Sequence, residues 1–310
     1  MTTGHSPTDL LTELEPAAER LLNRHLGMAQ EWFPHDFIPY SLGRDFDKEP
    51  WTPDQPRISG VAQIAFEVNL LTEDNLPSYH REIHRMFGAG DGPWINWVNR
   101  WTAEEGRHAI VLRDYLIVTR NIDPYALERS RMNQLQAAYD HDDGGNVLRG
   151  IAYVAFQELA TRISHRNTGR YSSDPVADRI MVRIASDENL HMVFYRDMLS
   201  EALKVDASAA VHAIADEVIA FQMPGAGMEN FRRKAGEMAK AGIYDLRVHH
   251  DDVVWPLLNH WGVFELTNLT PSAEMRRQEL RAFLVNLDAQ ATRFEERRGI
   301  ARERAIAEGG

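Results

Sequence analysis

Two copies of the motif Glu-x-x-His constrain this chain more than any other feature of its sequence. They are Glu105-Gly-Arg-His108 and Glu188-Asn-Leu-His191, and each lies in the middle of a long segment with helical periodicity. Residues three apart project from nearly the same face of an α-helix, so each motif can present a carboxylate and an imidazole to one metal ion. With 13 histidines and 46 acidic residues in the chain, about one such motif is expected by chance, so a single copy would carry little information.

Each motif is preceded by a glutamate in an earlier helical segment. Glu73 lies 32 residues before Glu105, and Glu158 lies 30 residues before Glu188. One glutamate from each of two helices, with Glu-x-x-His from each of two others, is the ligand set of ferritin-like di-iron carboxylate bundles. Four carboxylates and two imidazoles suit two iron ions that keep open positions for O2. We therefore expect a di-iron centre, with two Fe ions per chain, held by Glu73, Glu105, His108, Glu158, Glu188 and His191.

The alternative interpretation is that these residues have no metal. Acidic residues at helical spacing usually form solvated faces, and a single buried histidine is usually only hydrogen-bonded. Glu158 argues against this, because it lies in the apolar run 151–160, where a carboxylate is costly to bury unless a partner or a metal neutralises it. Asp187 adjoins Glu188 and can accept the free N–H of a metal-bound histidine. Thr161, three residues after Glu158, either places a hydroxyl beside the iron pair or simply lines its helix.

The rest of the chain is also helical in pattern, and no segment alternates with period two for long enough to predict a strand. Gly, Pro or Asx residues interrupt the pattern near 88–93, 121–124, 142–145 and 171–175. The periodicity predicts helices at about 8–30, 60–87, 94–119, 147–170, 175–203, 206–222, 227–241, 246–260 and 271–306, with a shorter one after residue 124. Pro77 cannot donate a hydrogen bond to the carbonyl of Glu73, four residues earlier, which predicts a kink beside that glutamate.

We therefore expect an all-α protein with a ferritin-like four-helix bundle core and additional flanking helices. The whole chain, 1–310, is interpreted as one domain. It comprises an N-terminal helix and a crossing loop in 1–58, the di-iron helix bundle in 59–203 and C-terminal helices in 204–310. The crossing loop is predicted by an aromatic stretch from Glu31 to Pro56, where closely spaced prolines prevent a regular helix.

Composition excludes several classes of protein. The absence of cysteine rules out a disulfide framework, a Cys-ligated zinc site, a thiol nucleophile and an iron–sulfur cluster of the chain's own. A formal net charge of −12 argues against nucleic-acid binding. No apolar stretch approaches the ~18 residues of a membrane-spanning helix, and the N-terminus lacks the pattern of a signal peptide. We expect a cytoplasmic protein with no membrane insertion.

Longer segments around the motifs resemble the soluble acyl-acyl-carrier-protein desaturase family, and most closely its actinobacterial branch. There is further similarity around Phe221-Gln-Met-Pro224. The matching segments are Trp32–Pro39, Leu71–Tyr79, Trp101–His108, Phe156–His165 and Asp187–His191. These ordered matches span most of the chain and are more specific than the six metal ligands, which other di-iron proteins share.

The resemblance implies that the same six residues bind iron and that Thr161 assists oxygen chemistry. It also implies that Trp32, His108 and Asp187 lie on a route for electrons entering from a ferredoxin. Members of the family are homodimers that insert a cis double bond into a saturated acyl chain, held as a thioester on acyl carrier protein. The chain departs from the family at Gly106, where the family usually has Asn. A glycine inside a helix costs about 1 kcal/mol relative to Ala, so the departure affects fine tuning rather than the ligand set.

The resemblance leaves the partners and their binding sites to be found. The chain has neither cysteine nor a Gly-rich fingerprint between a strand and a helix, so we expect a separate ferredoxin-type electron donor with its reductase. Acyl carrier proteins are typically acidic, and binding one to this acidic chain requires a local basic patch. The candidates are Arg232, Arg233 and Lys234 with Lys240, or Arg179 with Arg183, and each of these residues can equally be a scattered solvated cation.

Two further interpretations keep the iron but change the function. The chain can be a di-iron oxygenase, a hydroxylase or N-oxygenase acting on another substrate, or a non-catalytic ferritin-like iron-binding protein. A desaturase needs a dry apolar tunnel beside the metal. The candidate tunnel residues, each of which can equally belong to the plain core, are Met86, Phe87, Trp101, Tyr153, Met181 and Met192.

Overall fold

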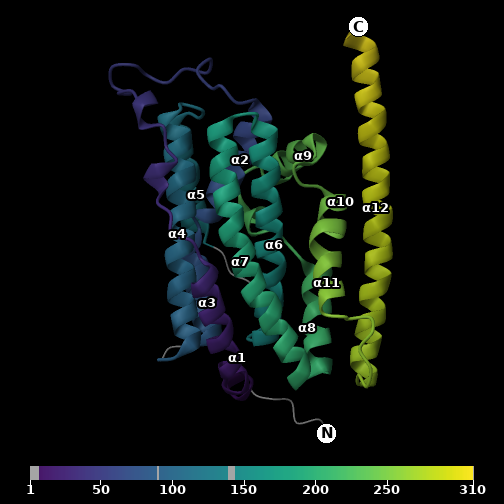
Figure 1. Ribbon diagram of the computed structural model, residues 1–310. Coiled ribbons are helices and arrows are strands. Elements are labelled where there is room, and N and C mark those ends of the chain that lie inside the picture. Colours follow the sequence, from purple (N-terminus) through teal and green to yellow (C-terminus); the bar gives the residue numbers. More distant parts are fainter. Residues whose placement is uncertain (1–6, 89–90, 139–143, 310) are drawn as a thin grey trace.

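The computed structural model describes residues 7–88, 91–138 and 144–309, and these contain helices and loops but no strand (Figure 1). The N-terminal two thirds contain α1 (Pro7–Met28), the 3-10 turns η1 (Pro34–Asp36) and η2 (Tyr40–Leu42), α2 (Gly60–Glu73), α3 (Leu76–Phe87), α4 (Pro93–Val118), α5 (Pro124–Ala137), α6 (Val147–Ser172) and α7 (Pro175–Val205). The remainder contains α8 (Ala207–Ala220), the 3-10 turn η3 (Pro224–Gly227), α9 (Phe231–Ala241), α10 (Leu246–Val248), the π-helix η4 (His249–Val254), α11 (Trp255–His260) and α12 (Pro271–Gly309). The expected all-α fold is confirmed.

The long helices begin at capping residues that are visible in the sequence. The side chains of Asp123, Asn146 and Asp174 accept hydrogen bonds from the first backbone N–H groups of α5, α6 and α7. Proline stands in the first turn of α4, α5 and α7, where its missing N–H has no partner to lose. The predicted bounds of α4, α6 and α7 are therefore correct to within two residues.

The prediction of one continuous helix over 60–87 is wrong. The helix stops at Glu73, and α3 starts at Leu76 after a break at Asp74 and Asn75. Pro77 lies in the first turn of α3, so its effect is a complete helix end rather than a kink. This places Glu73 in the last position of α2, at the entrance to a buried turn.

Two other segments differ from the predicted pattern. The helix predicted over 246–260 contains the π-helix η4 in its middle, and the helix predicted over 227–241 begins only at residue 231, after η3. The predicted breaks at 88–93 and 142–145 include residues 89–90 and 142–143, which lie outside the described residues. A π-helical turn is rare and often occurs at functional sites.

The apolar interior has two main clusters that meet at one level of the bundle. Along α4, buried side chains up to Trp101 belong to the first cluster, and those from Val111 onward belong to the second. Along α7 the order is reversed, with the second cluster ending at Ile184 and the first resuming at Met192. Both Glu-x-x-His motifs fall in the gap between the clusters.

The flanking helices cover this core from outside. α6 and α7 pack along their whole lengths, α1 lies against α4 and α7, and α12 runs along the outside of the bundle beside α8 and α10 (Figure 1). None of the helices in the described ranges combines the length and apolar character that crossing a bilayer would require.

Candidate metal site

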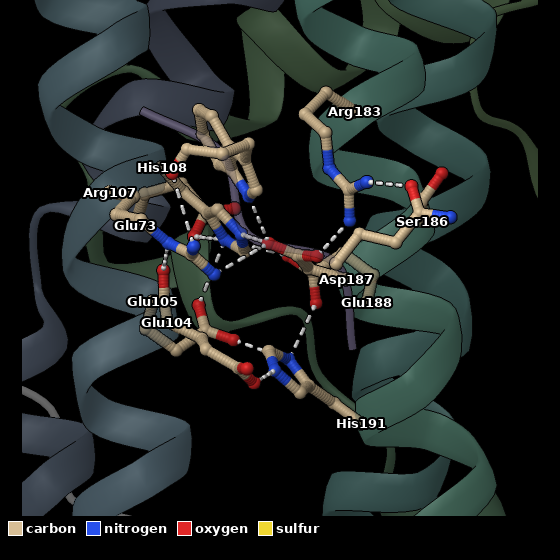
Figure 2. A network of polar contacts seen from close by, with 12 residues as sticks. Glu73, Glu104, Glu105, Arg107, His108, Arg183, Ser186, Asp187, Glu188 and His191 are labelled. Atoms are coloured by element: carbon tan, nitrogen blue, oxygen red, sulfur yellow. Dashed lines mark hydrogen bonds and ion pairs between the residues drawn. The ribbon is translucent and has the colours of Figure 1, made fainter. Parts of the chain in front are cut away.

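The six predicted ligands converge from four helices on one place in the interior. All six side chains belong to residues that are at most 7% exposed. Their donor atoms form two groups, within each of which all atoms lie within 4.8 Å of one another: Glu73, Glu105, His108 and Glu188, and Glu105, Glu158, Glu188 and His191. Because Glu105 and Glu188 belong to both groups, the two groups adjoin. They define two candidate metal positions, the first at His108 and the second at His191. Figure 2 shows most of these side chains pointing from α4 and α7 toward each other.

In each group, one imidazole nitrogen faces several carboxylates. His108 Nδ1 lies 3.3 Å from Glu105 Oε2, 3.3 Å from Glu188 Oε1 and 3.5 Å from Glu73 Oε2. His191 Nδ1 lies 2.8 Å from Glu105 Oε1 and 3.8 Å from Glu188 Oε2. Glu158 Oε2 is 3.7 Å from the same nitrogen. The arrangement has near twofold character, with one histidine and one non-motif glutamate at each position.

The inner atoms of this cluster lack hydrogen bonds. Five buried atoms that face the centre have no hydrogen-bond partner: Glu105 Oε1, His108 Nδ1, Glu158 Oε2, Glu188 Oε2 and His191 Nδ1. Buried polar atoms are otherwise almost always satisfied, so atoms left unpaired at one point indicate a missing common partner. Four carboxylates carry four negative charges, which two divalent cations would cancel, and the O/N donor set suits iron.

Electrostatics agree with a site that is complete only with cations. Burial lowers the pKa of His108, but the charge of Glu105 and the hydrogen bond to Asp187 raise it well above its usual value. Burial and the charges of Glu105 and Glu158 raise the pKa of Glu188 well above the usual range. The metal-free cluster thus holds protons where cations would otherwise balance the carboxylates.

Asp187 takes the position expected of a partner for a metal-bound histidine. Its Oδ2 lies 3.4 Å from His108 Nε2 and accepts a hydrogen bond of 2.7 Å from Trp32 Nε1. The Trp32 ring is 5% exposed and stacks on the His108 ring with centroids 6.3 Å apart. Arg107 and Arg183 also bind Asp187 (Figure 2). The three residues that the resemblance places on an electron route therefore form one contiguous chain.

Both glutamates outside the motifs have a buried partner that sequence reasoning did not identify. His165 Nε2 lies 2.7 Å from Glu73 Oε1, and Trp101 Nε1 donates to Glu158 Oε1 at 3.0 Å. His165 lies seven residues after Glu158, two turns along the same face of α6, and this spacing was the available signal.

Glu104, an acidic residue comparable to Asp187, was not predicted from the sequence. It precedes the first motif as Asp187 precedes the second, and that repetition was visible in the sequence. Its Oε2 lies 3.0 Å from His191 Nε2 and 2.8 Å from His25 Nε2. No sequence pattern connects His25 to the site, because α1 reaches it only through packing against α4 and α7.

Two cavities adjoin the cluster. The larger, of about 310 Å³, lies between α2, α6, α9 and η4, and the smaller, of about 50 Å³, lies between α3, α4 and α6. Thr72 and Glu73 line both of them, so both cavities border the donor cluster at the end of α2. Thr161 lines the larger cavity, and its hydroxyl donates to the carbonyls of Gln157 and Glu158 at 3.1 Å each.

Half of the candidate tunnel residues line a cavity. Met86, Trp101 and Tyr153 face the smaller one, whereas Phe87, Met181 and Met192 line neither and pack in the apolar clusters. Trp101 therefore contacts both the cavity and Glu158.

Two residues of the candidate basic patches are not available at the surface. Lys234 is 8% exposed and pairs with Glu67 at 2.8 Å, and the guanidinium of Arg183 is bound to Asp187. Arg232 and Arg233 are exposed on the outer side of α9, whose inner side lines the larger cavity.

Comparison with known proteins identifies relatives over almost the whole chain. The family profile described as fatty acid desaturase matches residues 6–308. DesA1 of Mycobacterium tuberculosis (strain H37Rv), an acyl-acyl-carrier-protein desaturase by name, is 47% identical over 296 residues, covering 92% of this chain and 87% of that protein. The chloroplastic stearoyl-acyl-carrier-protein 9-desaturase of Gossypium hirsutum is 29% identical over 309 residues, covering 93% and 76%. The crystal structure of DesA2 from M. tuberculosis H37Rv superposes with a TM-score of 0.70 at 29% identity, covering 86% of this chain and 98% of that one.

Proposed function

The chain belongs to the fatty acid desaturase family, and from this membership we propose that it inserts a cis double bond into a saturated fatty acyl chain carried as a thioester on acyl carrier protein. The observation that carries the proposal is that two cavities share Glu73 in their walls, beside six buried donor side chains, five of which have an unpaired inner atom. A substrate in these cavities would pass directly beside the metal.

The six converging residues would hold two iron ions, and Glu105 and Glu188 belong to both donor groups. A bound iron pair supplies the O2-dependent oxidation that no amino-acid side chain can perform on an unactivated methylene. In the overall reaction the substrate loses two hydrogen atoms and becomes an alkene. These two hydrogens, together with two electrons and two protons from outside, reduce one O2 to two water molecules. The protein's own task is to hold one C–C bond beside the site and to keep water away from it.

The larger cavity suits the acyl chain. Its walls include Val68, Phe221, Met223 and Met238, and its polar groups lie mainly at the Glu73 end and around His249. Apolar walls bind the chain through the hydrophobic effect and exclude water from the reacting carbon atoms. Thr161 lies on this cavity wall within one turn of Glu158, and we assign it a supporting role in oxygen chemistry.

Electrons from a ferredoxin-type donor would enter at Trp32. The guanidinium of Arg107 lies 4.9 Å from the centre of the Trp32 ring and that of Arg183 lies 5.8 Å from it, while the exposed Arg179 stands over Phe37. Because Arg107 and Arg183 are bound to Asp187, the exposed Arg179 is the cation of this group that is available to an acidic partner. From Trp32 the path continues through Asp187 to His108.

Acyl carrier protein would dock on the exposed side of α9. Arg232 and Arg233 lie there on the helix whose other side lines the larger cavity, so a carrier bound to them could insert its acyl chain directly. The double variant Arg232→Glu/Arg233→Glu should raise KM for the carrier-bound substrate, whereas Arg129→Glu on α5 should not change it. An unchanged KM in the double variant would exclude this surface.

The proposal also includes a cytoplasmic homodimer in which residues 1–310 act as one domain. Analytical ultracentrifugation would give the subunit number. The contiguous apolar cluster that joins α1, α4, α6, α7, α8 and α12 supports a single cooperative unit.

The decisive experiment is product analysis with defined substrates. Iron-loaded protein is reduced, then exposed to O2 with C16 or C18 acyl carrier protein, and the acyl products are analysed by mass spectrometry. A cis alkene supports the desaturase, an alcohol favours the di-iron oxygenase, and unchanged substrate with two irons per chain favours a non-catalytic iron-binding protein.

A further inference from the structure

The histidine at the second metal position has its own buried hydrogen-bond chain. His191 Nδ1 faces the carboxylate cluster, and its other nitrogen, Nε2, lies 3.0 Å from Glu104 Oε2. The same Glu104 oxygen lies 2.8 Å from His25 Nε2, and Arg100 Nη2 lies 2.5 Å from the other oxygen. The side chains of His25, Glu104 and His191 are at most 4% exposed, so solvent does not compete for these bonds.

This chain parallels the one at the first metal position. Asp187 Oδ2 lies 3.4 Å from His108 Nε2. It accepts hydrogen bonds from Trp32 Nε1 at 2.7 Å and from Arg107 at 3.1 Å. Each chain therefore consists of a ligand histidine, an acidic residue, an aromatic N–H group from the N-terminal 32 residues and an arginine from α4. The arginines Arg100 and Arg107 are seven residues apart, two turns along α4.

The two acidic residues serve the opposite motif. Glu104 directly precedes Glu105 on α4 but supports His191 on α7, and Asp187 directly precedes Glu188 on α7 but supports His108 on α4. The two hydrogen bonds thus cross between the helices in both directions. Helix α4 and helix α7 each orient the metal-facing imidazole of the other (Figure 2).

We propose that Glu104, held by His25 and Arg100, is a positioning residue for His191. This inference rests on the proposed metal-binding role of His191. A neutral imidazole carries one N–H, and donating it from Nε2 to Glu104 leaves the Nδ1 lone pair free to bind metal. Glu104 can only accept, and its two oxygens receive His191, His25 and Arg100, so a single ring orientation satisfies every partner.

A third metal ion is the competing interpretation, because His25, Glu104 and His191 offer three donor atoms close together. Two features argue against it. Arg100 already balances the charge of Glu104, and a cation there would have to share His191 through both of its nitrogens. Hydrogen bonds account for the 2.8 Å and 3.0 Å distances without a cation.

The test is metal binding rather than turnover. Apo-protein is titrated with Co(II), whose absorption spectrum reports occupancy at each position, and metal content is measured after loading with Fe(II). Wild type is expected to bind two ions per chain. Glu104→Gln should weaken one of the two sites about 10–100-fold and leave the other unchanged, because it removes the charge that orients His191.

Matched variants separate positioning from general damage. Asp187→Asn should weaken one site similarly, and combining it with Glu104→Gln should weaken both. His25→Phe should weaken the same site as Glu104→Gln, whereas His25→Gln, which keeps an N–H donor, should restore binding. Glu201→Gln, at an exposed ion pair with Arg20, should bind as wild type does. Circular dichroism of each variant verifies folding.

The outcomes distinguish this inference from the proposed function. If wild type binds no metal, the proposed function fails. If wild type binds two ions and both Glu104→Gln and His25→Phe bind them equally well, the positioning role is wrong. Three ions in wild type, with one lost in either variant, would instead establish the third metal site and overturn the proposal.

Discussion

His165 and Glu73 form a buried pair, with His165 Nε2 2.7 Å from Glu73 Oε1. The pair lies inside the bundle, on α6 and at the end of α2, and it leaves only Glu73 Oε2 facing His108. Although burial alone would raise the pKa of Glu73, the neighbouring imidazoles of His108 and His165 hold it below its usual value. Trp101 holds one oxygen of Glu158 in the same way, so each of these two glutamates turns its other oxygen toward the cluster.

Replacing His165 should destabilise the metal-free protein. His165→Leu would leave Glu73 Oε1 buried without a donor, which costs about 1–3 kcal/mol. The free energy of unfolding from urea titration measures this loss, and His165→Gln, which can still donate, should recover part of it. Equal stability of His165→Leu and wild type would show that the pair contributes nothing.

Glu158→Ala should abolish desaturation and leave the helical fold largely intact. The carboxylate is 1% exposed and has one unpaired inner oxygen, so its removal takes away a predicted metal ligand. It also removes one buried hydrogen bond, from Trp101 Nε1, which is a small loss beside the packing of the long helices. Product analysis and far-ultraviolet circular dichroism measure the two effects. Glu201→Ala, at a partly exposed ion pair with Arg20, is the control, and wild-type turnover by Glu158→Ala would remove Glu158 from the site.

Gly106→Ala should stabilise the protein by up to about 1 kcal/mol, since glycine inside a helix is less favourable than alanine by that amount. The position has room, because an added Cβ would meet only Leu76 Cδ2, at 3.9 Å. Urea unfolding provides the measurement. Gly169→Ala is the contrasting variant: a Cβ there would lie 2.8 Å from Met181 Cβ, so that variant should lose stability. A loss in Gly106→Ala would mean that the glycine is needed at its place.

Gly150→Ala should shift activity toward shorter acyl chains. Gly150 and Met86 both line the smaller cavity, and a Cβ at Gly150 would overlap the end of the Met86 side chain. Met86 would have to move within the cavity, which shortens the space beyond the metal. Competition between C16 and C18 substrates measures the shift. Met86→Ala should move the preference toward longer chains, and unchanged selectivity in both variants would show that no substrate carbon reaches this cavity.

His249, which lines the larger cavity, should make the stability of the protein fall as the pH is lowered. Burial and the neighbouring His250 lower the pKa of His249 to about 4. In its neutral form the ring accepts a hydrogen bond from the Tyr244 hydroxyl at 2.9 Å. An unfolded histidine titrates near 6.5, so between about pH 6.5 and 4 only the unfolded chain binds this proton, and stability falls as the pH falls.

The comparison of His249→Phe with wild type tests this dependence. The variant should lose less stability than wild type between pH 7 and pH 4.5 in urea unfolding, because it has no proton to bind on unfolding. His35→Phe, at an exposed position, should follow wild type. Parallel losses in wild type and His249→Phe would contradict the prediction.

What the sequence determined by itself is everything that depends on neighbours within one helix. The spacing of Glu105 and His108, and of Glu188 and His191, places each pair on one face, because the helix geometry is local. Capping residues such as Asp174 locate helix starts for the same reason. The pairing of each glutamate with its histidine on one helix face and the all-α fold were therefore predictable, whereas the six-residue ligand set stays a prediction.

Only the tertiary structure decided which groups meet across helices. Glu104 supports His191 rather than its own motif because α4 and α7 lie side by side with their motifs at one level, and His25 joins them only because α1 packs there. The burial of Lys234 against Glu67 depends on the face that α9 turns toward α2. Such contacts join residues far apart in sequence, and no periodicity encodes them, because they arise from how whole helices pack.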